Sequence, residues 1–68
     1  MNKITFAEVK VGAQFVFCGA ALDYAIKNKG VLPVWALCDV FTKTSPTQYS
    51  FGLYSYTANP RVLCVVKS

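Results

Sequence analysis

Histidine is absent from the 68 residues of the chain, and acidic residues are scarce. Histidine is the side chain that most often serves as a general base or a metal ligand near neutral pH. The three acids, Glu8, Asp23 and Asp39, are scattered along the chain, so no carboxylate pair for acid–base catalysis is indicated. Glycine-rich phosphate-binding motifs are missing too. We therefore expect a protein that is not an enzyme, with no catalytic residues and no cofactor.

Cysteine occurs three times, at Cys18, Cys38 and Cys64. A disulfide framework normally needs an even number of cysteines, and a zinc site normally needs closely spaced pairs. Each of these cysteines lies in an apolar run, so we expect buried free thiols, no metal, and a reducing compartment such as the cytoplasm. The longest apolar stretch, Val11–Leu22, is too short to span a membrane.

The composition allows one small domain, residues 1–68, with an unusually apolar surface. Hydrophobic residues make up 54% of the chain and aromatic residues 15%, which is enough to form a core. A partner chain or a homo-oligomer would cover apolar surface that a monomer leaves exposed. The net charge of +4 favours an anionic partner, although such a charge also serves solubility.

Runs of β-forming residues between turn signals predict five strands. The predicted strands span residues 13–18, 34–43, 47–51, 53–57 and 61–66. Gly12, Ser45-Pro46, Gly52 and Asn59-Pro60 provide the turn signals. In the entry segment, residues 1–12, we expect the side chains of Phe6, Val9 and Val11 to face inward. A single helical turn fits over Phe6–Val9.

A short helix is predicted over about residues 20–29, between Gly19 and Pro33. Leu22, Ala25 and Ile26 share one face at helical spacing. Gly30 fits the position just after a helix end. The alternative for this segment is a strand and hairpin that turns at Asn28–Gly30. The predicted fold is therefore mainly β: a five-stranded antiparallel barrel or roll with a helical insertion.

Two kinds of side chain are candidates for binding. Tyrosines on a predicted hairpin could form a stacking platform for bases or a protein interface, or could fill the core. We expect Phe51 and Trp35 to be core residues. For Tyr54 and Tyr56, a binding surface and a structural role remain equally open. Lysine and arginine side chains flank this hairpin and lie near the end of the predicted helix. They could bind an anionic partner, or they could simply be solvated charges. The candidate binding residues are Tyr24, Lys27, Lys29, Lys43, Tyr54, Tyr56 and Arg61.

Several short motifs resemble those of a small family of bacterial and phage proteins. They are Phe6, Val11–Phe15, Phe41–Tyr49 and the strand Arg61–Val66. The resemblance covers most of the chain except about residues 19–34, which have the character of an insertion. It implies a small SH3-like β-barrel without an agreed activity. A phage-type origin would favour a protein that binds a host protein, including an inhibitor of a bacterial defence system.

Three functions follow as hypotheses from these observations. The first is a small non-enzymatic protein that binds a host or partner protein. The second is a basic β-barrel that binds nucleic acid. The third is a structural or oligomerisation module. None of the three involves a membrane.

Overall fold

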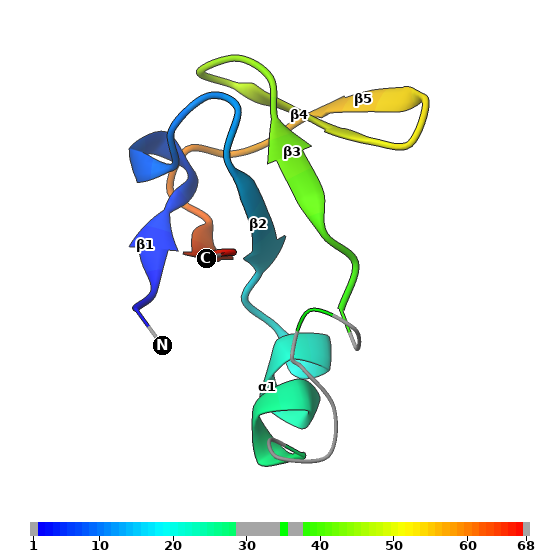
Figure 1. The fold of residues 1–68 in the computed structure, drawn as a ribbon. Helices are drawn as coiled ribbons and strands as arrows, with labels where there is room; N and C mark the ends of the chain where they lie inside the picture. The colour runs from blue at the N-terminus through cyan, green and yellow to red at the C-terminus, as the bar shows by residue number, and fades with distance from the viewer. Residues whose placement is uncertain (1, 29–34, 36–37, 68) are drawn as a thin grey trace.

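The computed structural model describes residues 2–28, 35 and 38–67, which form one antiparallel sheet and one short helix (Figure 1). The six strands follow the order β1-β6-β2-β3-β4-β5 across the sheet. The elements are β1 (Ile4–Thr5), the 3₁₀ turn η1 (Phe6–Glu8), β2 (Gln14–Phe17), α1 (Ala20–Lys27), β3 (Phe41–Lys43), β4 (Gln48–Phe51), β5 (Tyr54–Thr57) and β6 (Leu63–Val66). Among the described residues, no helix is long and apolar enough to cross a membrane.

The mainly β prediction is confirmed, but the number of strands and the closure are not as expected. The described residues form six strands instead of five, and β1 and β5 lie at opposite ends of the order. Pairing between those two strands would be needed for a barrel, and none occurs in the described part of the chain. The sheet is therefore open, with β1 and β5 as its two edges.

Strand β2 is central, and its alternating side chains build a core on each face of the sheet. On one face, the helix-side core consists of Val16, Leu22, Ala25 and Val65. On the other face, the aromatic-side core consists of Phe6, Val9, Phe15 and Cys64. Phe15 and Val16 are neighbours in β2 and therefore point to opposite faces of the sheet. Both cores depend on β2 and β6, which pair from Phe15↔Val66 to Phe17↔Cys64.

Helix α1 confirms the predicted helical insertion and rules out a hairpin over residues 20–27. Leu22 and Ala25 are fully buried against the sheet, as the helical spacing predicts. Asp23 lies in the first turn and Lys27 in the last, where each charge is favourable to the helix dipole. The predicted end at Gly30 lies outside the described residues.

The predicted strand over residues 34–43 is wrong for most of its described part. Only Phe41–Lys43 forms a strand, whereas Trp35 is helical. Trp35 and Cys38 pack against the helix-side core, which places Trp35 at a core as expected. An apolar run without a clear period fits a buried helix or loop as well as a strand, which explains the error. Residues 34, 36 and 37 lie outside the described part.

The entry segment contains the strand that the sequence pattern did not reveal. Ile4–Thr5 pairs with β6, with Ile4 opposite Cys64 and Thr5 opposite Leu63. The helical turn at Phe6 is confirmed as η1, and Glu8 Oε1 accepts hydrogen bonds from Thr5 N (3.0 Å) and Thr5 Oγ1 (2.9 Å). These two bonds lower the pKa of Glu8. Phe6 and Val9 are buried as predicted, but Val11 is 58% exposed because it lies in the turn before Gly12.

Candidate functional site

The hairpin β4–β5 extends beyond the rest of the sheet and ends in a tight turn (Figure 1). Its strands pair from Gln48↔Thr57 to Phe51↔Tyr54, which leaves only Gly52 and Leu53 between them. Gly52 has φ +61°, while Leu53 has a negative φ. This combination is the type II′ pattern, which suits the twist of a two-residue hairpin and favours glycine at its first position.

Aromatic rings connect the buried core to this hairpin. Phe15 contacts Phe6 edge-on at 5.5 Å between ring centroids and Tyr49 at 6.0 Å. Tyr49 in turn stacks on Tyr56 at 5.4 Å. A second link between the core and the hairpin joins the rings of Phe41 and Phe51, whose centroids lie 5.2 Å apart. The outer rings of the hairpin thus rest on a continuous set of rings that ends in the core, which holds them in place.

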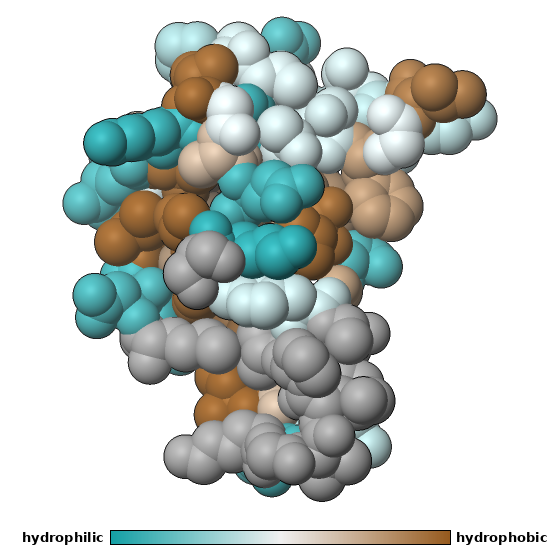
Figure 2. All heavy atoms as spheres, viewed as in Figure 1, coloured by the Kyte–Doolittle hydropathy of each residue, from teal (hydrophilic) through white to brown (hydrophobic). Residues whose placement is uncertain are grey.

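The outer end of this aromatic row is exposed. Leu53 is 100% exposed, Tyr54 69%, Tyr56 44% and Phe51 43%. Figure 2 shows hydrophobic atoms at the projecting end of the molecule, where the hairpin lies in Figure 1. We call these four residues the hairpin face. The prediction that Phe51 is buried in the core is wrong. Its ring packs on Phe41 but remains partly exposed to solvent.

The hairpin face lies in a part of the chain without charge. No lysine, arginine, aspartate or glutamate occurs from Thr44 to Pro60. The other side of the hairpin carries small polar residues, including Ser50, Ser55 and Thr57. Tyr54 and Tyr56 were predicted as candidates from the sequence, but Leu53 and Phe51 were not. The uncharged stretch was the signal in the sequence that could have identified the whole surface.

Lys43 does not lie on the surface, which corrects its assignment as a binding residue. It is 2% exposed, and its Nζ donates to the carbonyl oxygens of Phe6 (2.7 Å) and Ala7 (3.4 Å). The same ammonium lies 4.5 Å from the centroid of the Phe6 ring. The carbonyls at η1 and the ring face solvate the charge in place of water. Lys43 is therefore a structural residue that ties β3 to η1.

The other described candidates do not gather with Tyr54 and Tyr56. Tyr24, 63% exposed, and Lys27 lie on α1, at the end of the molecule away from the hairpin (Figure 1). Arg61 is exposed in the connection from β5 to β6, where its backbone N–H donates to Asn59 Oδ1 at 2.9 Å. Lys29 lies outside the described residues. Of the described candidates, Tyr54 and Tyr56 share the hairpin and Tyr24 and Lys27 share one side of α1, and the two pairs lie on separate surfaces.

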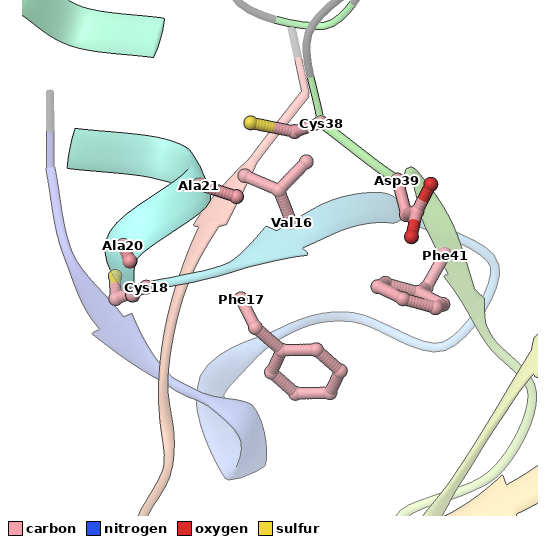
Figure 3. Close-up of a pocket in the computed structure, with 9 residues that line it drawn as sticks. Val16, Phe17, Cys18, Ala20, Ala21, Cys38, Asp39 and Phe41 are labelled. Carbon is pink, nitrogen blue, oxygen red and sulfur yellow. The ribbon is translucent and has the colours of Figure 1, made fainter. Parts of the chain in front are cut away.

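A second surface feature is a shallow cavity of about 280 Å³ between β2, α1 and the segment that leads into β3 (Figure 3). Its lining is mostly apolar and includes Cys18, Cys38 and Asp39. Burial, followed by the charge of Asp39, raises the pKa of the Cys38 thiol, which makes the thiolate less accessible. Within the described part of the chain, no three histidine, cysteine or acidic side chains are placed to hold a metal ion. The raised pKa means that the Cys38 thiol of this cavity is not activated.

The described thiols are free, and Cys64 is fully buried while Cys18 and Cys38 are partly exposed. Burial raises the pKa of Cys64 to about 11, with a further increase from Cys18 and an opposing effect from Lys43. Such a thiol is inert near neutral pH. Cys64 thus serves packing in the aromatic-side core.

No protein-family model, curated protein or solved structure matches this chain. Among the described residues, the hairpin face combines exposed aromatic side chains, a rigid support and an absence of charge.

Proposed function

We propose that this chain is a small non-enzymatic protein that binds a partner protein through its hairpin face. The observation that carries the proposal is the fully exposed Leu53, flanked by Phe51, Tyr54 and Tyr56 on an uncharged hairpin. Single exposed apolar residues are common on proteins, but a contiguous group at a projecting tip is typical of an interaction surface.

The residue types of the hairpin suit contact with another protein. Tyrosine and phenylalanine give large contact areas at a low cost in conformational entropy, and serine adapts its hydrogen bonds to the opposite surface. Residues that dominate binding energy are commonly aromatic and lie on a rigid support. Here Tyr56 stacks on Tyr49 and Phe51 packs on Phe41, so the rings are already ordered before a partner arrives.

A nucleic-acid surface on the same hairpin has less support. That hypothesis needs Lys43 and Arg61 beside Tyr54 and Tyr56, and Lys43 is buried. Without cations between Thr44 and Pro60, the hairpin has no side chain that could neutralise phosphates. Stacking alone would then carry the binding, whereas proteins that bind single strands combine stacking with a positive groove.

We infer a biological setting for this proposal from the sequence motifs that resemble those of a small family of bacterial and phage proteins. In that setting the partner is a host protein in the bacterial cytoplasm, and a component of a defence system is one such target. The exposed hairpin would block or recruit that target without any chemistry of its own.

Photo-crosslinking from matched tyrosine positions tests the proposal. Benzoylphenylalanine replaces Tyr54 in one variant and Tyr24 in the other, because the two side chains are similarly exposed, at 69% and 63%. Irradiation in the cells that produce the protein should give a specific adduct with a different protein from position 54 and not from position 24; an adduct with a second copy of this chain does not count. An adduct from position 24 alone would move the binding surface to α1, and the absence of adducts from both would contradict a protein partner in those cells.

A further inference from the structure

The outer edge of β5 has backbone groups without partners in the sheet. β5 pairs only with β4, so its second side is free in the described part of the chain. Beyond the end of the hairpin strands, Ala58 N–H donates to the Thr47 carbonyl at 2.9 Å. Hydrogen-bonded and non-bonded pairs alternate along antiparallel strands. With the observed register, Tyr56 and Tyr54 therefore bond to β4, while Ser55 and Thr57 turn their N–H and C=O groups outward.

This edge lacks the features that usually prevent edge-to-edge pairing. Proteins protect sheet edges with very short strands, charged residues or proline. The opposite edge has such protection, because β1 is only two residues long and directly follows Lys3. β5 has four residues, all exposed, with neither charge nor proline among them. It is thus the edge of this sheet that can accept another strand.

We propose that the strand that pairs with β5 is β5 of a second copy of this chain, in an antiparallel dimer with its twofold axis at Tyr56. In this register Ser55 lies opposite Thr57 of the second copy, and Thr57 opposite Ser55. Each of these two pairs exchanges two hydrogen bonds. All outward backbone groups of both strands are then satisfied, and the same surface is used on both copies, as a closed twofold interface requires.

The charge distribution favours a second copy at this edge. The chain carries a net charge of +4, so two copies repel each other over most surfaces. The uncharged segment from Thr44 to Pro60 lets two hairpins meet without opposing like charges. The hairpin also extends beyond the body of the molecule, which leaves the edge accessible (Figure 1). Because the remaining edge, β1, is short and follows Lys3, the pairing ends at a dimer and does not continue into a fibre.

The side chains fit the same arrangement. Tyr56 faces Tyr56 of the second copy as a non-hydrogen-bonded pair, in which the Cα atoms approach to about 4.5 Å. Tyr54 lies opposite Ala58 of the second copy, where a small side chain leaves room for the ring. The exposed tyrosines of the two copies then form one continuous surface, so the dimer would double the hairpin face.

Sedimentation velocity over about 1 to 500 µM of the full chain tests this proposal, since association depends on concentration. The natural sequence should shift from monomer to dimer across this range. Two double variants test the register: Ser55→Lys with Thr57→Glu, and Ser55→Lys with Thr57→Lys. All these positions are exposed, so both variants should fold, which circular dichroism verifies.

The two variants should behave in opposite ways. In the proposed register the first variant places lysine opposite glutamate at both pairs and should dimerise at least as well as the natural chain. The second places lysine opposite lysine and should stay monomeric at low salt. A natural chain that remains monomeric throughout overturns the proposal and leaves the edge to a strand of another protein. Equal association of both variants overturns it as well, because β5 then does not form the interface.

Discussion

Lys43 is buried, and backbone carbonyls of the described residues solvate its charge. The ammonium donates to Phe6 O and Ala7 O and lies over the Phe6 ring. The sequence could not reveal this burial, since Phe6 is 37 positions away and lysine is rarely buried. The pattern of β3 placed Lys43 correctly in a strand, but only the position of η1 decides what the side chain meets.

Replacement of Lys43 should therefore cost stability and not merely surface charge. We expect Lys43→Ala to lower the free energy of unfolding by about 2–4 kcal/mol, because it leaves a cavity and removes charge-assisted hydrogen bonds. Lys10→Ala, a matched change at an exposed lysine, should stay within about 0.5 kcal/mol. Urea denaturation measures both. Similar small effects for the two variants would show that Lys43 is solvated by water.

The buried thiol of Cys64 should make the protein less stable at alkaline pH. Its pKa is raised from 9.0 to about 11 by burial first and by Cys18 second. The folded state thus holds the thiol proton more tightly than the unfolded state does. This contribution to stability is complete below pH 9 and is lost as the pH rises from 9 to about 11. We expect Cys64→Ala to flatten the fall in unfolding free energy across this window, and parallel curves for the two proteins would contradict the assignment.

The hairpin β4–β5 is the element that the sequence predicted best. The predicted strands 47–51 and 53–57, with Gly52 as a turn signal between them, correspond closely to β4, β5 and the turn that joins them. The exposed fraction of Phe51 could not be predicted, because it depends on how far the hairpin extends beyond Phe41. At the other extreme, β1 is two residues long and leaves no pattern to read.

The type II′ turn gives this element a sharp test at Gly52. No atom lies within 4 Å of a Cβ added there, so the cost of a substitution comes from the backbone conformation alone. We expect Gly52→Ala to destabilise the protein by about 1–2 kcal/mol, because L-residues disfavour φ +61°. A synthetic chain with D-alanine at position 52 should retain or exceed the natural stability. Equal thermal stability of the L- and D-alanine proteins would contradict the turn type.

At the scale of the whole molecule, the structure separates the residues that the sequence had grouped. The proposed set joined cations and tyrosines from the insertion and the hairpin, but α1 lies at the end of the molecule away from the hairpin β4–β5 (Figure 1). Tyr24 and Lys27 therefore cannot share a contact area with Tyr54. A sequence shows which side chains are unusual, whereas the strand order β1-β6-β2-β3-β4-β5 decides which of them meet.

The central claim is that the hairpin face, and not the exposed surface in general, binds the partner. The most direct measurement is the affinity of the partner identified by crosslinking for the natural chain, for Tyr54→Ala and for Tyr24→Ala, by calorimetric titration. Loss of an aromatic residue that dominates binding costs about 2 kcal/mol or more, so the Kd should rise at least about thirtyfold for Tyr54→Ala. For Tyr24→Ala the Kd should stay unchanged. Equal affinities for the two variants, or a loss confined to Tyr24→Ala, would contradict the account.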